Sequence, residues 1–293
     1  MDDPKIRLKC DRLNGILEFI DRFPLILKKR VFLNCSDKQI DDMQNLTIYI
    51  RQWALRMVTS VKSSHIGSCL SAAEVTAVIQ TIANKSEDVF IFSKGHAAAT
   101  LYGALAGLKI IPEELLETFG KDDSELTGHV NHAIPNVSYS SGSLGHGLPY
   151  GVGVAIGSKH KKVYVLISDG ELNEGTTWES LAIANHLRLE NLTLVVDANG
   201  IQSFGNTKDI LDLEPLRAKF ESFGWACFDV DGHSIPALYT SLSSSALNKP
   251  RAIIARTIKG KGVKSMENKL EWHYKSPSPE NLQAFLDEVK NNA

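Results

Sequence analysis

The sequence predicts an α/β fold, with a mostly parallel sheet and helices on both faces. Five short runs rich in Val, Ile and other apolar residues show no alternation with polar residues, which is typical of strands buried on both faces of a parallel sheet. Helical patterns separate several of these runs, as the crossover connections between parallel strands require. The chain has 293 residues, of which 43% are hydrophobic, so it is long enough for one large core.

The chain begins with a segment that we interpret as an addition to the main domain. Its apolar residues recur at helical spacing before a proline interrupts the pattern: Leu13, Ile16, Leu17, Ile20, Phe23 and then Pro24. We therefore expect an α-helical N-terminal arm over residues 1–40, packed on the domain or on a partner. The main domain is expected to span residues 41–293.

Helices and strands are expected to alternate along the main domain. An amphipathic pattern predicts a helix over residues 43–61, followed by a polar turn at residues 63–68 and a second helix over residues 71–84. The expected strands span residues 89–92, 163–167, 192–196, 227–230 and 252–257. Further helices are expected near residues 96–108 and 178–187. One α/β domain with an N-terminal arm is the simplest organisation.

The composition argues against several classes of protein. The net charge is −2 and no block of like charge occurs, so a nucleic-acid partner is not suggested. No apolar run approaches the roughly 20 residues that cross a bilayer, and the charged first residues lack the apolar stretch of a secretory signal. The cysteines are scattered without CxxC spacing, which favours free thiols in a reducing compartment: Cys10, Cys35, Cys69 and Cys227. We therefore expect a soluble cytoplasmic protein.

Polar segments follow two neighbouring predicted strands. Asp169 offers a carboxylate after one strand, Asn199 offers an amide oxygen after the next, and the backbone carbonyl of Ile201 offers a third oxygen. Ligands of open parallel sheets bind at the carboxyl ends of the strands, and Mg²⁺ takes such oxygen ligands. Gly170 lets the backbone approach a phosphate, and the helix after it presents its positive N-terminal end. Asp-Gly and Asn-Gly are also common turns when taken singly, but together at this spacing they predict a metal–diphosphate site.

The segment from Ser168 to Ile201 resembles the thiamine diphosphate motif, which begins with Gly-Asp-Gly and ends in paired Asn. More widely, residues 44–277 resemble the diphosphate-binding (PP-type) domain of transketolase. The resemblance implies a thiamine-diphosphate-binding fold, with thiamine diphosphate as the cofactor. In that family, a bound Mg²⁺ (or Ca²⁺ or Mn²⁺) bridges to the diphosphate of the cofactor. By this likeness the metal ligands are Asp169, Asn199 and the Ile201 carbonyl.

Two positions depart from the family motif. Ser168 stands in place of the first Gly, and Ala198 stands in place of the first Asn of the pair. Neither position is a metal ligand in the family, so we expect cofactor binding to survive, with altered packing of the loops.

Four of the nine histidines lie in segments that resemble the histidine motifs of the family: His65, His96, His129 and His273. The resemblance implies that His96 approaches the phosphate, His129 meets sugar hydroxyls, and His273 lies near both diphosphate and substrate. Imidazole titrates near neutral pH, so it can donate to a phosphate or carry a hydroxyl proton. We expect His65, His129 and His273 to act in catalysis. A single histidine is more often structural, and the histidines without such context are interpreted that way: His132, His160, His186 and His233.

The resemblance extends to further cofactor contacts, including Gly142 and Leu144 in a glycine-rich loop. The full set expected to contact the cofactor is His65, His96, Gly142, Leu144, Asp169, Gly170, Glu171, Asn199 and His273. Two segments have two interpretations each. The likeness places residues 259–262 near the diphosphate, although a solvated basic turn explains them equally well. Glu174 matches an acidic interface position of the family, but it is also a carboxylate at a helix start, where the helix dipole favours it.

The activity implied by the resemblance is transfer of a two-carbon ketol unit between sugars or phosphosugars, by the diphosphate- and Mg²⁺-binding subunit of a two-subunit, transketolase-like enzyme. In the family, a second domain binds the aminopyrimidine ring of the cofactor and carries an activating Glu. No second α/β block follows here, so we expect a separate C-terminal partner subunit with that domain, in a heterotetramer.

Other assignments remain open at this point. One is a deoxyxylulose-phosphate-synthase-like subunit, or a subunit of another thiamine-dependent carboligase or decarboxylase. A second is a non-catalytic, degenerate subunit, which the departures at Ser168 and Ala198 motivate.

Overall fold

The computed structural model describes residues 35–83, 86–246 and 248–292. The chain divides into two units, Met1–Asn34 and Cys35–Ala293, and the elements below belong to the second. The expected helical arm over residues 1–40 lies almost entirely outside the described residues, so the arm and its boundary with the main domain stay predictions.

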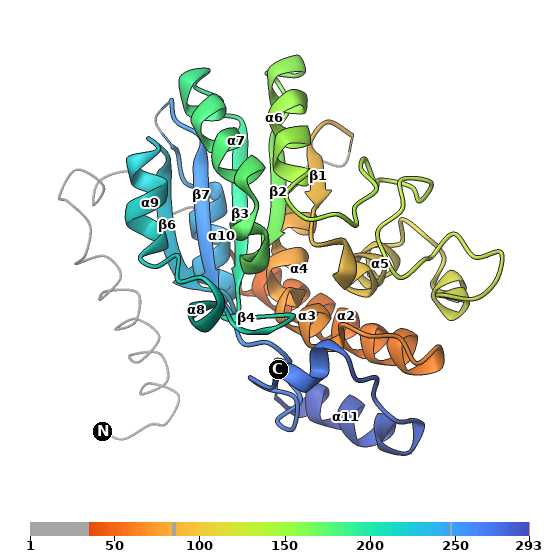
Figure 1. Ribbon diagram of the computed structural model, residues 1–293. Helices are drawn as coiled ribbons and strands as arrows, with labels where there is room; N and C mark the ends of the chain where they lie inside the picture. Colours follow the sequence, from red (N-terminus) through yellow and green to blue (C-terminus); the bar gives the residue numbers. More distant parts are fainter. Residues whose placement is uncertain (1–34, 84–85, 247, 293) are drawn as a thin grey trace, which may run out of the picture. The chain divides into compact units, whose positions relative to one another are not determined.

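A five-stranded sheet forms the centre of the described unit, with strand order β1-β2-β3-β7-β6 (Figure 1). Every neighbouring pair in this sheet is parallel. The strands are β1 (Val89–Phe92), β2 (Val163–Ser168), β3 (Leu192–Ala198), β7 (Arg251–Arg256) and β6 (Ala226–Asp231). All residues of β2 and β3 are buried, as continuous apolar runs require. The predicted parallel sheet is confirmed, and each expected strand position carries a strand.

Helices cover both faces of this sheet (Figure 1). One face carries α6 (Gly147–Gly157), α7 (Gly175–His186) and α9 (Leu216–Ser222). The other carries α10 (Ile235–Ser243) and α4 (Ala73–Ile82), backed by α2 (Asp37–Ser60) and α5 (Ala98–Gly107). Helix α11 (Pro279–Asn291) packs on α2, and α3 (Ile66–Ser71) also contacts α2. Among the described residues, no helix has the length and apolar character to cross a membrane.

Shorter elements connect these layers and build the loops at the sheet edge. The single-turn 3₁₀ helices are η2 (Gly95–Ala97), η3 (Glu113–Thr118), η4 (Asp169–Asn173) and η5 (Leu270–His273). A small antiparallel hairpin pairs β4 (Ile201–Gln202) with β5 (Gly205–Asn206), and the short helix α8 (Thr207–Ile210) follows it. Two of these turns, η2 and η4, directly follow the strands β1 and β2, so they shape the carboxyl edge of the sheet.

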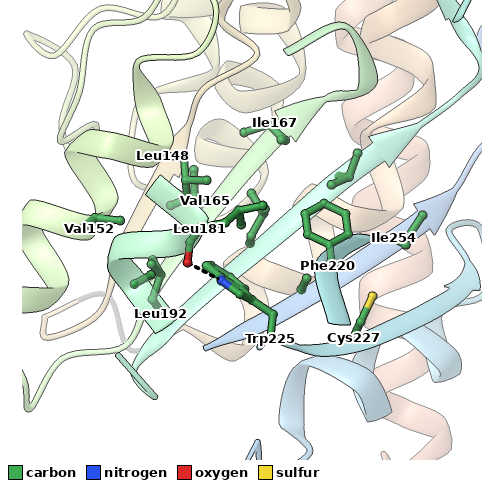
Figure 2. Close-up of a cluster of buried hydrophobic side chains, with 14 of the residues drawn as sticks. Leu148, Val152, Val165, Ile167, Leu181, Leu192, Phe220, Trp225, Cys227 and Ile254 are labelled. Carbon is green, nitrogen blue, oxygen red and sulfur yellow. Dashed lines mark hydrogen bonds between the residues drawn. The ribbon is translucent and has the colours of Figure 1, made fainter. Parts of the chain in front are cut away.

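A large apolar cluster lies between the sheet and the helices α6, α7 and α9 (Figure 2). Val165 and Ile254 come from the sheet, while Leu181 and Phe220 come from the helices. The indole N–H of Trp225 donates to the carbonyl of Leu181 at 2.9 Å, so this buried polar group is satisfied. Full burial of one large apolar side chain such as Leu181 stabilises the folded state by about 1.5–3 kcal/mol. The cluster therefore makes the sheet a rigid support for the loops at its carboxyl edge.

Two helix boundaries differ from the sequence predictions. Helix α2 begins at Asp37 rather than at residue 43, because Ser36 and Gln39 form a capping box ahead of the first apolar turn. The turn expected at residues 63–68 is wrong in its second half, where α3 begins at Ile66. His65 adopts a left-handed backbone (φ 71°) there, and its carbonyl accepts the amides of the first helical turn.

Candidate functional site

The carboxyl ends of four parallel strands bring the polar loops together. Register pairs Phe92 of β1 with Leu166 of β2, Ser168 of β2 with Asp197 of β3, and Ala198 of β3 with Arg256 of β7. The loops that follow these strands therefore leave the sheet at nearly the same level. They carry the polar residues Lys94, His96, Asp169, Asn199 and Lys259.

The three expected metal ligands lie on two loops in direct contact. One carboxylate oxygen of Asp169 accepts the N–H of Gly200 at 2.7 Å. The side-chain oxygen of Asn199 accepts the N–H of Ile201 at 3.1 Å. Gly200 has φ +78°, a conformation that favours glycine and lets the loop curl around the carboxylate. The fold thus places a carboxylate, an amide oxygen and the Ile201 carbonyl around one turn.

Asp169 is a buried carboxylate with no cationic side chain in direct contact among the described residues. It is 8% exposed, and it forms no ion pair with any of the residues that the structure describes. Burial raises the pKa of Asp169 to about 7, and the negative charge of nearby Asp197 adds to the effect. The Gly200 N–H and the charges of Lys259 and Lys94 offset only part of this rise in pKa. A divalent cation would supply the missing positive charge. A buried carboxylate together with an amide oxygen and a carbonyl oxygen is a donor set that fits a hard cation such as Mg²⁺.

The described residues contain no group of three or more His, Cys, Asp or Glu side chains arranged to hold a metal. A cation at Asp169 would therefore complete its coordination with oxygens of Asn199, of the Ile201 backbone, of water and of a phosphate. Mg²⁺ commonly keeps waters and binds through one or two carboxylates plus phosphate. The donor set fits such an ion and not a structural zinc, which takes Cys and His.

Four histidines from four separate segments form one cluster beside these loops. The ring of His65 is its centre, with ring-centroid distances of 4.7 Å to His273, 5.3 Å to His96 and 6.3 Å to His129. His96 and His273 lie 6.3 Å apart. The four histidines singled out in the sequence are thus brought together by the fold, whereas their roles stay predictions.

Three of these imidazoles are held in the neutral form. Burial lowers the pKa of His65 to about 4, helped by the charges of His129 and Lys259. Burial and the Lys259 charge likewise lower the pKa of His273 to about 3. Burial also lowers the pKa of His96 well below its usual value. The cluster therefore offers neutral donors and acceptors rather than cations near pH 7.

Lys259 crosses from the β7 loop into the site. Its side chain is 1% exposed, and its Nζ donates to the Ile201 carbonyl at 2.8 Å and contacts Nδ1 of His273 at 3.0 Å. An ammonium has no lone pair, so Nδ1 of His273 accepts and the neutral ring carries its proton on Nε2. Burial lowers the pKa of Lys259 to about 8. The solvated-turn interpretation is therefore wrong for Lys259.

A buried ion pair at the same edge was not identified as functional in the sequence. Lys94 follows β1, Asp197 ends β3, and both side chains are fully buried where they pair. Ser71 donates to the same carboxylate at 2.6 Å, and Thr257 also donates to it. The available signal was a charged residue in each of two otherwise apolar strand ends, since buried charges are almost always paired.

Glu171 ties three loops together. One of its carboxylate oxygens accepts the hydroxyl of Ser93 at 2.5 Å and the N–H of Gly145 at 3.1 Å, and the other accepts the N–H of Ser168 at 3.0 Å. Burial raises the pKa of Glu171 despite these donors. These contacts explain a structural role, and a cofactor contact for Glu171 stays a prediction.

The glycine-rich loop lies between the histidine cluster and helix α7. A Cβ at Gly142 would lie 3.8 Å from the ring of His129, so Gly142 lies beside the cluster, while Leu144 is half-buried two residues later. Gly145 has φ +80°, and a Cβ there would lie 2.5 Å from the Cβ of Glu174. Glu174 is exposed at the N-cap of α7 and caps no backbone amide, so an interface role for it stays a prediction.

The match to protein families decides the identity of this fold. The model for the thiamine diphosphate binding domain of transketolase matches residues 43–285. The chain belongs to the transketolase family. The resemblance inferred from Ser168 to Ile201 is thereby confirmed, and so is the expected thiamine-diphosphate-binding fold.

Curated relatives in the transketolase family comprise both separate subunits and longer enzymes. The chain is 39% identical over 275 residues to an apulose-4-phosphate transketolase subunit of Actinobacillus succinogenes, covering 88% of this chain and 100% of that one. It is 32% identical to the subunit of the same name from Phocaeicola vulgatus, covering 86% and 95%. Human transketolase is 36% identical, with 87% of this chain but 43% of the human protein covered.

Solved transketolases share the three-dimensional arrangement. The enzyme from Campylobacter jejuni superposes with a TM-score of 0.78 at 27% identity, and that from Leishmania mexicana with 0.76 at 26%. The match covers 85% of this chain in both cases, but 43% and 41% of those chains. This chain therefore corresponds to less than half the length of these solved transketolases.

Proposed function

We propose that this chain is the diphosphate- and metal-binding subunit of a two-subunit, transketolase-like enzyme. Its activity is transfer of a two-carbon ketol unit between sugars, phosphorylated ones in particular. The observation that carries the proposal is a pair of buried, unpaired charges on adjacent loops, the Asp169 carboxylate and the Lys259 ammonium. The two charges act on each other at a distance, but neither forms a direct ion pair with any described residue. A metal with a diphosphate would supply both missing contacts.

The roles of the residues follow from this pairing. Asp169, Asn199 and the Ile201 carbonyl would hold Mg²⁺, and Lys259 would donate to the diphosphate. Gly170 leaves room for a phosphate, because a Cβ there would meet nothing closer than 3.5 Å. His96 lies in the same cluster and would donate to a phosphate of the cofactor. When bound, thiamine diphosphate supplies the carbon nucleophile and the electron sink of the reaction.

The neutral histidines would handle the protons of the substrate. The rings of His129 and His273 both lie close to the ring of His65, and a neutral imidazole can accept a proton from a sugar hydroxyl and return it later. The positive charge of Lys259 disfavours a lasting imidazolium at His65 and His273. These rings therefore suit transient proton transfer rather than storage of a proton.

The departures from the family motif do not disable the site by this reasoning. The Ser168 side chain accepts from the backbone of the next turn in a capping box with Glu171. Ala198 is part of the buried apolar cluster under the site. Both residues are accommodated by local packing, which favours a working subunit over a degenerate one.

A partner chain is part of the proposal. Two relatives matched over 100% and 95% of their length are named as subunits, a word that implies at least one further chain. We propose that a second subunit supplies the pyrimidine-binding domain and its activating Glu, in a heterotetramer. Large apolar side chains exposed on α6 and α7 support contact with another protein surface: Tyr150, Ile156, Ile183 and Leu187.

The first substrate to test is apulose 4-phosphate, because the same two relatives carry its name. A cytoplasmic location is also part of the proposal. The free thiols of the described chain fit a reducing compartment: Cys35, Cys69 and Cys227.

The decisive experiment is calorimetric titration of thiamine diphosphate with MgCl₂ into the full chain, alone and with the candidate partner. We expect metal-dependent binding that Asp169→Ala abolishes while the fold survives by circular dichroism. Activity of the pair is then assayed with sugar phosphates. Absence of cofactor binding even with the partner would refute the enzyme assignment, and binding that Asp169→Ala leaves intact would refute the metal site.

A further inference from the structure

The carboxylate of Asp197 collects donors from four different segments. Lys94 from the β1 loop, Ser71 from the end of α3 and Thr257 from the end of β7 all donate to it. The fourth donor is the side-chain N–H of Asn199, at 3.3 Å from Oδ2. Asp197 itself is fully buried. A carboxylate held from so many directions cannot rotate without losing several charge-assisted hydrogen bonds.

The contact with Asn199 matters because an amide has two different ends. Its oxygen accepts and its nitrogen donates, so turning the amide over exchanges the two. Here Nδ2 of Asn199 faces the Asp197 carboxylate, and Oδ1 faces the N–H of Ile201. The reversed amide would set oxygen against a carboxylate and N–H against N–H. Both contacts would be repulsive, so Asp197 permits one orientation.

We propose that Asp197 is a positioning residue that fixes the Asn199 amide with its oxygen toward the metal, and that Lys94 holds Asp197 in place. The inference rests on the proposed function, in which Asn199 Oδ1 is a metal ligand. The Asn199 amide oxygen is already oriented before a metal binds. Metal binding therefore spends no free energy on turning this side chain over. Groups that orient metal ligands typically change metal affinity by about 10–100-fold when removed.

The test measures Mn²⁺ binding by electron paramagnetic resonance, on the full chain with saturating thiamine diphosphate and with the partner subunit if cofactor binding needs it. In Asp197→Asn, residue 197 carries an amide that can accept or donate, so both orientations of Asn199 become accessible. We expect its Kd for Mn²⁺ to rise about tenfold or more. Ser71→Ala is the matched control, since it removes a different donor from the same carboxylate. We expect its Kd to stay within about twofold.

The double variant Asp197→Asn/Asn199→Asp separates orientation from general packing. A carboxylate at position 199 presents oxygen whichever way it turns, and the net charge equals that of the wild type. We expect this variant to recover Mn²⁺ affinity to within about threefold of the wild type. Recovery would not follow if Asp197 merely supported the fold.

Each other outcome has a definite meaning. Wild-type affinity in Asp197→Asn, an equal loss in Ser71→Ala, or no recovery in a folded double variant overturns the positioning role. If Asp197→Asn does not fold, the Kd for Mn²⁺ is compared between the single variant Asn199→Asp and the double variant Asp197→Asn/Asn199→Asp. A difference above about threefold between these two Kd values overturns the positioning role. Absence of Mn²⁺ binding by the wild type, or full binding by Asp169→Ala, overturns the proposed function and this inference with it.

Discussion

Lys94 and Lys259 are both buried at the same edge of the sheet, yet their charges are neutralised differently. Lys94 pairs directly with the Asp197 carboxylate, and both side chains are fully buried. Lys259 contacts a backbone carbonyl and an imidazole, and no carboxylate among the described residues pairs with it. Burial lowers the pKa of Lys259 to about 8, and the charges of Asp169 and Asp197, which are not in direct contact with it, offset only part of this effect.

The two carboxylates divide in the same way. Burial alone would raise the pKa of Asp197, but the charge of Lys94 and the hydrogen bonds from Lys94, Ser71 and Thr257 together outweigh it, and the pKa is lowered. The pKa of Asp169 is raised to about 7. One lysine and one aspartate thus form a buried ion pair, and the other two charges have no direct ion pair among the described residues. The predictions below test this division, from the largest expected effect to the smallest.

Lys94→Met tests the paired lysine. It leaves Asp197 buried without its cation, so the free energy of unfolding should fall by about 3–5 kcal/mol. Urea denaturation followed by circular dichroism measures the change. Lys259→Met is the matched control and should unfold at the wild-type urea concentration or above it, since it removes an unpaired buried charge. Equal destabilisation by the two variants would contradict the difference between an ion-paired Lys94 and a Lys259 without a direct ion pair.

Asp169→Asn tests the unpaired carboxylate in the metal-free chain. The folded pKa is raised from 3.8 to about 7, so the stability that Asp169 contributes is present below pH 3.8 and lost as pH rises through 7. At pH 8 the variant should therefore exceed the wild type by about 4 kcal/mol, since one pKa unit is worth about 1.4 kcal/mol. Urea unfolding at pH 4 and pH 8 measures this difference. A gap that does not grow with pH would count against the unpaired state of Asp169.

Lys259→Met also tests whether the Lys259 ammonium binds the diphosphate of the cofactor. Its affinity for thiamine diphosphate with Mg²⁺ should fall by about 2 kcal/mol, or roughly 30-fold, the scale of a hydrogen bond to a charged group. Isothermal titration calorimetry measures this loss. Lys261→Met is the control, because Lys261 lies on the same loop but is already near Glu267, at 3.7 Å. A comparable loss in both variants would mean that the loop, not the Lys259 charge, determines affinity.

The histidine cluster gives the smallest expected effect. The pKa of His65 is lowered from 6.5 to about 4, so the stability it contributes is present above pH 6.5 and lost as pH falls through 4. His65→Asn should reduce this acid destabilisation by about 1 kcal/mol, discounted because the ring is only partly buried. Thermal unfolding between pH 6.5 and pH 4 measures it. His160→Asn, at an exposed turn, should follow the wild-type curve.

The sheet and the proximity of the candidate oxygen ligands could be predicted from the sequence because both depend on local patterns. Unalternating apolar runs indicate parallel strands, and the ends of such strands meet at one edge. Asp169 and Asn199 were therefore expected to lie together, and their loops are in contact. Periodicity says nothing about contacts between distant segments. The proximity of His65 and His273 could be inferred only from the family resemblance.

The buried charges could not be predicted in the same way. The segment from Lys259 to Gly262 has the composition of a solvated turn, and burial arises only where Gly260 donates to the Gly67 carbonyl at 2.9 Å. Likewise, the role of Asp197 depends on donors from three other segments. The start of α3 was missed because His65 takes a left-handed backbone, which is uncommon for residues other than glycine.

The backbone hydrogen bond from the His65 N–H to the His273 carbonyl, at 2.9 Å, joins an early segment of the chain to a late one. All five strands of the sheet precede residue 273 in the chain, the last of them ending at Arg256. A chain cut between Arg256 and His273 would therefore keep every strand of the sheet and still lose a member of the histidine cluster. The sheet and the site thus draw on different parts of the chain, and the site needs a late segment that contributes no strand.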